Sequence, residues 1–299
     1  MDAVFSLLPI RPGSTIASVR IAEWLSKELD IHLYDHAGIA EAGPIRNLFI
    51  VNGSTLYCKC LPEIAKAVEQ ADKVIWVQND YTLPPPKDVS DAQSPFRRAF
   101  ADRRLVPHYW TTCQENSKLT EGSRWINWNV LGYKEDAEQA GLESRDVIYY
   151  GAYRGSRSQQ FQAMLSSFHE GLSISSTSDK FPSSVRVQPF RDGVLKNLAR
   201  YGLGVYLQDA KSTDKLHSPA TRFYEMLSVG LPMVFHPDCV STLAKYDIDV
   251  RPYIFTSSTN AMNLINNRKQ IQMMQREWQR PFEANLKRVV REAYAALNA

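Results

Sequence analysis

The chain contains little cysteine and no long apolar run. Four cysteines occur in 299 residues, and Cys58 and Cys60 lie too close together for the usual spacing of zinc ligands. We therefore expect reduced thiols, as in a cytosolic protein, rather than a zinc site. No apolar stretch reaches the length that crosses a bilayer, and Arg11 and Pro12 interrupt the first apolar run before it resembles a secretory signal. These features predict a soluble cytoplasmic protein without a membrane partner, in the host cytoplasm if the protein is viral.

Other patterns are also missing. No G-x-G-x-x-G follows the first expected strand, which argues against a dehydrogenase. No cluster of acidic residues indicates a metal site, so we expect no obligatory metal or other cofactor. The net charge of +3 is mildly basic and does not by itself require nucleic acid as a partner. Nothing in the sequence indicates an oligomeric state.

The residues that are present predict an α/β protein with two cores. Hydrophobic residues make up 44% of the chain, and apolar runs alternate with stretches of helical spacing. In the first half, strands are expected at 3–10, 31–34, 47–52, 74–77, 108–112 and 125–130, with helices at 16–29 and 61–70. In the second half, strands are expected at 147–150, near Ile174, at 203–207 and at 231–235, with helices at 159–169, 194–200 and 271–297, the last broken at Pro281.

This alternation predicts two α/β domains, each built on a parallel sheet with helices on both faces. We place the N-terminal domain at 1–135 and the C-terminal domain at 146–275. The segment 276–299 is expected to form a closing helix that packs back on the N-terminal domain. In parallel sheets of this kind ligands bind beyond the carboxyl ends of the strands. Candidate site residues are therefore sought in the loops that follow strands.

The most specific motif is S-P-A-T-R-F-Y-E-M-L-S-V-G-L-P-M-V-F, from Ser218 to Phe235. It predicts a loop, a short helix and a buried strand. Arg222 and Glu225 are three residues apart, so they share one face near the start of the helix, where unpaired N–H groups favour anions. An arginine there suits a diphosphate, and a carboxylate one turn on suits the two hydroxyls of a ribose. An ordinary surface ion pair is the alternative.

A second motif, G-A-Y-R-G-S-R, passes from an expected strand into an expected helix. Gly151 and Gly155 allow close approach of the backbone or a positive φ. Arg154 and Arg157 place two guanidinium groups beside the start of the helix, which suits a phosphate. A solvated turn with surface arginines is the alternative interpretation.

These two motifs resemble the donor-binding elements of glycosyltransferases with the GT-B fold. The resemblance implies two Rossmann-like domains that face each other across a cleft, with the acceptor domain at 1–135 and the nucleotide-sugar domain at 146–275. The resemblance implies that Glu225 holds the nucleotide ribose and that Arg222 and nearby basic groups hold the diphosphate of a nucleotide sugar, most often UDP-glucose in similar enzymes. Many retaining members carry a glutamate at the position of His217, so the stereochemical outcome stays open. Ser14 is expected to close over the sugar or phosphate, or to cap the following helix. The expected donor-site residues are Ser14, Gly151, Arg154, Arg157, Ser218, Arg222 and Glu225.

The N-terminal half is then expected to hold the acceptor. Asp80 follows the strand in V-I-W-V-Q-N-D-Y, where a carboxylate can deprotonate an acceptor hydroxyl as a general base. An aspartate that starts the turn before the proline run is an equally good interpretation. Asp35 and His36 are the second candidates for the base, and Asn79 is an expected acceptor contact.

Arginines and aromatic residues are interleaved in S-P-F-R-R-A-F-A-D-R-R-L-V-P-H-Y-W. This pattern suits phosphate contacts and base stacking, and a solvated helix before a core strand is the alternative. A compact enzyme with such a half resembles bacteriophage DNA glycosyltransferases, which add a sugar to the hydroxymethyl group of a modified pyrimidine taken out of the stack. Double-stranded DNA with a modified base is therefore the expected partner. The expected acceptor contacts are Asn79, Arg97, Arg98, Arg103 and Arg104.

Two other functions stay open at this point. A glycosyltransferase of the same fold can act on a glycan, a protein or a small molecule. A protein on the same scaffold can also bind a nucleotide or nucleic acid without catalysis, which predicts binding without turnover.

Overall fold

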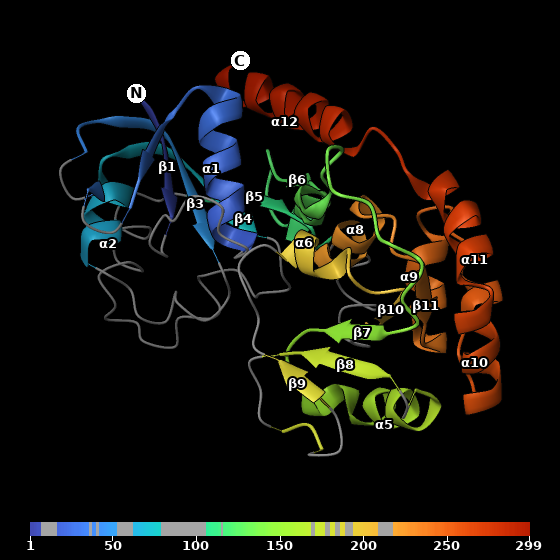
Figure 1. Cartoon of the computed structure of the whole chain (residues 1–299). Coiled ribbons are helices and arrows are strands. Elements are labelled where there is room, and N and C mark those ends of the chain that lie inside the picture. Colours follow the sequence, from blue (N-terminus) through green and yellow to red (C-terminus); the bar gives the residue numbers. More distant parts are fainter. Residues whose placement is uncertain are drawn as a thin grey trace. The chain divides into compact units, whose positions relative to one another are not determined.

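The computed structural model contains two compact units, each built around one parallel sheet (Figure 1). The first unit comprises Met1–Trp128 and Glu283–Ala299, and the second comprises Asn129–Phe282. The structure describes residues 1–6, 17–35, 38–39, 42–52, 62–78, 106–114, 116–168, 171–176, 180–182, 186–188, 194–208 and 218–299. No helix within these ranges is both long enough and apolar enough to span a bilayer.

The sheet of the first unit has the strand order β2-β1-β3-β4-β5-β6, with every pair parallel. Its strands are β1 (Asp2–Ser6), β2 (His32–Tyr34), β3 (Ile45–Asn52), β4 (Ala71–Gln78), β5 (His108–Thr111) and β6 (Arg124–Trp125). The described helices of this unit are α1 (Ala17–Leu29), α2 (Pro62–Glu69), the 3₁₀ turn η3 (Asn116–Lys118) and most of α12 (Phe282–Asn298). The chain reverses its direction of winding between β1 and β3, which makes this a doubly wound sheet.

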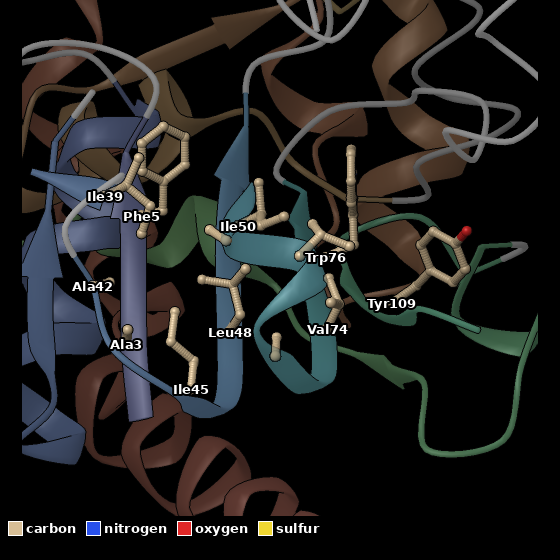
Figure 2. Packing of buried hydrophobic residues seen from close by; sticks show 13 residues of the cluster. Ala3, Phe5, Ile39, Ala42, Ile45, Leu48, Ile50, Val74, Trp76 and Tyr109 are labelled. Carbon is tan, nitrogen blue, oxygen red and sulfur yellow. The ribbon is translucent and has the colours of Figure 1, made fainter. Parts of the chain in front are cut away.

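The core of the first unit lies against the central strands, and Figure 2 shows its side chains. Strands β1, β3 and β4 are covered on both faces, so their sequences are almost continuously apolar. Helix α1 contributes an apolar stripe that includes Val19, Ala22 and Leu25, at the spacing of one helical face. The labelled members of the core cluster are Ala3, Phe5, Ile39, Ala42, Ile45, Leu48, Ile50, Val74, Trp76 and Tyr109.

The sheet of the second unit has the strand order β11-β10-β7-β8-β9, again all parallel. Its strands are β7 (Val147–Tyr150), β8 (Leu172–Ser175), β9 (Arg186–Gln188), β10 (Leu203–Tyr206) and β11 (Met233–Phe235). Its described α-helices are α5 (Ser158–Ser167), α6 (Val194–Leu198), α8 (Thr221–Ser228), α9 (Val240–Ala244), α10 (Ser258–Asn266) and α11 (Arg268–Gln275). The 3₁₀ turns are η4 (Trp128–Gly132, from the unit boundary), η5 (Gly155–Arg157), η6 (Pro237–Cys239), η7 (Arg251–Tyr253) and η8 (Arg276–Trp278).

Two expectations for local structure are wrong. The strand expected at 125–130 ends at Trp125, and the following residues form η4 instead. The indole N–H of Trp128 donates to the carbonyl of Trp110 at 3.0 Å, which turns the chain inward over the edge of the sheet. No strand was expected at 186–188, just after the polar stretch 175–184, yet β9 forms there and pairs with β8 through Ile174 and its neighbours.

Asp2 connects β1 to the C-terminal helix within the first unit. Its carboxylate accepts hydrogen bonds from Nε and Nη2 of Arg46 at 2.9 and 2.8 Å, from Nδ2 of Asn47 at 3.0 Å, and from the hydroxyl of Tyr294 on α12. Asn47 also donates to Oδ1 of Asn298 at 2.9 Å. Burial acts to raise the pKa of Asp2, but the hydrogen bonds from Arg46, Tyr294 and Asn47 outweigh it and hold the pKa well below its ordinary value.

We expect Asp2→Asn to lower the free energy of unfolding by about 1–3 kcal/mol near neutral pH, because it removes a buried charged acceptor. A carboxyl group whose pKa is lower in the folded state stabilises the protein above its unfolded pKa and loses that contribution as the pH falls. The difference between wild type and variant should therefore shrink below about pH 4. Urea unfolding across pH measures this, with Asp72→Asn at an exposed position of β4 as the control. A difference that persists unchanged in acid would contradict the assignment.

Candidate functional site

The candidate site lies at the carboxyl edge of the second sheet, where β7 and β10 are neighbours. These two strands are the point at which the strand order reverses, and ligands of doubly wound proteins bind outside that point. Strand β7 ends at Tyr150 and β10 at Tyr206, both of which are buried. Helix α8 begins at Thr221 and presents its first turn to the same region through contacts described below.

The segment that leads into α8 is held by hydrogen bonds from buried polar groups. The backbone N–H of Ala220 donates to the Tyr206 hydroxyl at 2.8 Å, and that hydroxyl donates to Oε1 of Gln208 at 2.9 Å. Nε2 of Gln208 donates to the carbonyl of Ser218 at 3.0 Å, and Nδ2 of Asn129 donates to the carbonyl of Pro219 at 3.0 Å. Ala220 occupies the N-cap position and supplies no side-chain cap. The start of α8 is therefore fixed in place without a capping side chain at its N–H groups.

Arg222 is enclosed by three tyrosines. Its Nη1 donates to the carbonyl of Tyr150 at 3.4 Å, and its Cζ lies 5.9 Å from the ring centre of Tyr149 and 5.7 Å from that of Tyr206. These distances are typical of cation–π contacts. The Nε atom is buried and has no hydrogen-bond partner among the residues that the structure describes. The guanidinium is thus held mainly by aromatic faces.

Gly151 provides the space that Arg222 occupies. A Cβ atom at this position would lie 2.5 Å from Nη1 of Arg222 and 2.8 Å from the hydroxyl of Tyr149. The φ angle of Gly151 is +150°, which side chains of L-residues rarely adopt. The glycine that follows β7 is therefore required by both the backbone conformation and the neighbouring guanidinium.

Arg157 brings a second positive charge to the site. It is 6% exposed, and its Nη1 donates to the Tyr149 hydroxyl at 3.5 Å. Burial lowers the pKa of Arg157 below its ordinary value, and the charges of Arg222 and Arg154 act in the same direction. Burial also acts to lower the pKa of Arg222, but the hydroxyl groups of Tyr149 and its neighbouring tyrosines outweigh it and raise the pKa. Both side chains remain guanidinium ions at neutral pH.

Three positively charged features therefore lie close together: Arg157, Arg222 and the N-terminus of α8. Arg157 and Arg222 repel each other strongly enough to affect the pKa of Arg157. Arg222 also lies in the first turn of α8, where the helix dipole disfavours a cation. An anion placed here would relieve both repulsions, and guanidinium groups pair well with phosphate oxygens. The chemistry of the site therefore favours a ligand with several negative charges, such as a diphosphate.

Glu225 supplies a carboxylate one turn further along α8. Its Oε2 lies 2.6 Å from the Tyr150 hydroxyl, and the residue is 6% exposed. The side chain of this glutamate is therefore oriented by the end of β7 rather than paired across a surface with Arg222. A carboxylate is an acceptor with two oxygens, so it can receive hydrogen bonds from the adjacent hydroxyls of a sugar.

The structure brings together part of the expected donor site. Gly151, Arg157, Arg222 and Glu225 share contacts through Tyr149 and Tyr150. Arg154 lies close enough to lower the pKa of Arg157, and Ser218 begins the segment before α8. Asp35 accepts the N–H of Gly38 at 3.1 Å, so it stabilises a local turn. The remaining expected site residues lie outside the described residues: Ser14, His36, Asn79, Asp80, Arg97, Arg98, Arg103, Arg104 and His217.

Reasoning from the sequence missed the tyrosines. Tyr149, Tyr150 and Tyr206 were expected simply as strand residues, yet each contacts Arg222. Their position at the carboxyl ends of two strands is the signal that would have found them, once the strand order was known. Within the described ranges, His, Cys, Asp and Glu side chains do not gather in threes as a metal site would require.

Comparison with solved structures identifies the fold as that of GT-B glucosyltransferases. T4 phage β-glucosyltransferase is 10% identical to this chain with a TM-score of 0.66, and the match covers 98% of both chains. A structure of the DNA-modifying enzyme β-glucosyltransferase, studied with and without its substrate uridine diphosphoglucose, is 11% identical with a TM-score of 0.66 and covers 97% of this chain and 98% of that one. An α-glucosyltransferase in complex with UDP and a 13-mer DNA is 11% identical, with a TM-score of 0.51 and 99% of both chains covered.

These likenesses confirm the fold class predicted from the sequence, two Rossmann-like α/β regions with a C-terminal helix. They also confirm, at the level of the fold, the resemblance to phage DNA glucosyltransferases. No protein-family model matches the chain, and no curated protein matches its sequence. The chain therefore shares the fold of these enzymes. At 10–11% identity the likeness shows the fold alone, so the evidence for a function comes from the site.

We expect Gly151→Ala to displace the Arg222 guanidinium, because the added methyl group cannot coexist with Nη1 at the present distance. The variant should bind pyrophosphate at least about tenfold more weakly and lose about 1–3 kcal/mol of stability. Calorimetric titration with pyrophosphate and urea unfolding measure the two effects. Gly155→Ala is the matched control, since a Cβ there meets no atom within 4 Å. Equal behaviour of the two variants would contradict the role of Gly151.

Proposed function

We propose that this protein is a glycosyltransferase that moves glucose from UDP-glucose to the hydroxymethyl group of a modified pyrimidine in double-stranded DNA. The observation that carries the proposal is the meeting of Arg157, Arg222 and Glu225 at the switch point of the second sheet. The fold supports it, because its structural neighbours include a DNA-modifying β-glucosyltransferase that uses uridine diphosphoglucose and an α-glucosyltransferase bound to UDP and DNA.

The donor is proposed to bind with its diphosphate against the guanidinium groups and its ribose against the carboxylate. Arg222 and Arg157, with Arg154 nearby, would neutralise the charge that develops on the diphosphate as it leaves. Glu225 would accept hydrogen bonds from the ribose hydroxyls one helical turn away. This assignment of the diphosphate to the arginines and the ribose to the glutamate matches the chemistry of each side chain, and it needs no metal ion.

The acceptor is proposed to bind the first unit. The acceptor oxygen attacks the anomeric carbon of glucose, the bond from that carbon to the phosphate oxygen breaks, and UDP leaves with the electron pair. Asp80 is proposed to accept the proton of the attacking hydroxyl as general base. Contacts to DNA phosphates are assigned to Arg97, Arg98, Arg103 and Arg104, with Asn79 beside the base and Ser14 beside the donor.

We expect Glu225→Ala to weaken binding of UDP-glucose by about tenfold to a hundredfold, because hydrogen bonds to a charged group are lost. Isothermal titration calorimetry with UDP-glucose provides the measurement. Glu138→Ala, at an exposed position, is the control for the loss of a negative charge. Unchanged affinity in the Glu225 variant would refute its assignment to the ribose.

The transfer itself is tested with UDP-glucose and duplex DNA that contains 5-hydroxymethylcytosine. Mass spectrometry of the DNA should show the addition of one hexose per modified base. Asp80→Asn should lower the rate by about 10²–10⁴-fold and leave donor binding intact, because general-base catalysis contributes that much. If the protein binds the donor and transfers the sugar to a glycan but not to DNA, the proposed acceptor is wrong and the proposed donor site stands. Binding without any turnover or slow donor hydrolysis would indicate a non-catalytic protein.

A further inference from the structure

We propose that Tyr150 is a positioning residue that holds Glu225 in the orientation needed to bind the donor ribose, and so sets a preference for ribonucleotides over deoxyribonucleotides. This inference rests on the function proposed above, because it extends the role given there to Glu225. It is carried by the geometry at the end of β7, where one hydroxyl group contacts both ends of the Arg222–Glu225 turn.

The contact between Tyr150 and Glu225 is short and buried. The phenolic oxygen lies 2.6 Å from Oε2 of Glu225, within the range of a hydrogen bond to a charged oxygen. Tyr150 is 4% exposed and Glu225 is 6% exposed. The hydroxyl group also lies 3.1 Å from the carbonyl oxygen of Arg222. Because the phenol has one proton and the carboxylate is the stronger acceptor, the proton is directed mainly to Glu225.

This bond limits where the carboxylate can lie. A glutamate side chain has several rotatable bonds and would otherwise sample many rotamers, at an entropic cost on binding. Tyr150 restrains the end of the side chain, and Gly132 leaves room for its middle, since a Cβ at position 132 would lie 3.1 Å from Cγ of Glu225. Tyr150 is itself placed by the sheet, where it pairs in register with Ser175 of β8. The carboxylate is therefore oriented before any ligand arrives.

The same bond leaves the carboxylate able to bind a ligand. Two carboxylate oxygens offer about four acceptor positions, and adjacent ribose hydroxyls need two. The side chains of Tyr150 and Arg222 each contact the backbone of the other residue, since Nη1 of Arg222 donates to the carbonyl of Tyr150. The strand end thus contacts both the residue proposed to hold the ribose and the residue proposed to hold the diphosphate.

Tyr149 is the control residue for Tyr150, because its contacts are with the two arginines. It precedes Tyr150 on the same strand, so its side chain points to the opposite face. Its hydroxyl group receives a hydrogen bond from Nη1 of Arg157 at 3.5 Å, and its ring lies beside Arg222. Tyr149 therefore acts on the diphosphate side of the site, and removal of its hydroxyl should not distinguish one sugar from another.

The test compares UDP with 2′,3′-dideoxy-UDP, which has the same diphosphate and base without the ribose hydroxyls. Calorimetric titration gives both dissociation constants for the wild type, Tyr150→Phe and Tyr149→Phe. Tyr150→Phe should weaken binding of UDP about tenfold and leave binding of the dideoxy nucleotide unchanged. Tyr149→Phe should weaken both nucleotides by the same factor. Each substitution removes one oxygen and keeps the ring, and circular dichroism melting checks that the variants fold.

A double-mutant cycle completes the test. If Tyr150 acts through Glu225, Tyr150→Phe should cost no further UDP affinity in a Glu225→Ala background. Equal losses for both nucleotides in folded Tyr150→Phe, no loss for either, or an additional loss in the Glu225→Ala background would overturn the proposal. A wild-type protein that binds neither nucleotide would instead overturn the proposed function, so the two failures are distinguishable.

Discussion

The candidate site depends on two guanidinium groups, one buried and one half-buried, that the second unit holds near each other. Arg157 is buried, Arg222 is enclosed by tyrosines, and the two repel each other. Such an arrangement costs stability unless neighbouring groups compensate. The faces of Tyr149 and Tyr206 supply part of the compensation through cation–π attraction of about 0.5–2 kcal/mol each. The remainder is what a bound diphosphate would provide, and this makes the free protein receptive to a polyanion.

The other features of the site follow from the need to hold these charges. Gly151 has no side chain because Arg222 fills the space beside it. The chain entering α8 is fixed by Tyr206 and by buried amides, so the helix begins where its N–H groups and Arg222 point to the same region. Tyr150 then connects the strand end to Glu225. One strand end and one helix thus position the guanidinium groups proposed to bind the diphosphate and the carboxylate proposed to bind the ribose, at the switch point where ligands of doubly wound sheets bind.

The sequence predicted the class of fold, and it singled out Arg222 and Glu225, whose roles stay predictions, because both inferences depend on local patterns. Arg222 and Glu225 are three apart in a short helix with clear ends, and alternating apolar runs indicate parallel sheets. The tyrosines were missed because their role depends on which strands become neighbours, and β7 and β10 are far apart in sequence. Strand β9 was missed because it is only three residues long and directly follows a polar stretch, so its pairing with β8 identifies it as a strand. The acceptor residues, including Asp80, stay predictions.

Thermal unfolding of the wild-type protein with UDP, UMP and uridine tests whether the two guanidinium groups bind a diphosphate. If the two guanidinium groups bind a diphosphate, UDP at about a hundredfold excess over its dissociation constant should stabilise the protein by about 2.7 kcal/mol. UMP should stabilise it less at the same concentration, and uridine should have almost no effect, because the charge that compensates Arg157 and Arg222 is reduced and then removed. No stabilisation by UDP, or equal stabilisation by uridine, would show that Arg157 and Arg222 do not bind a diphosphate.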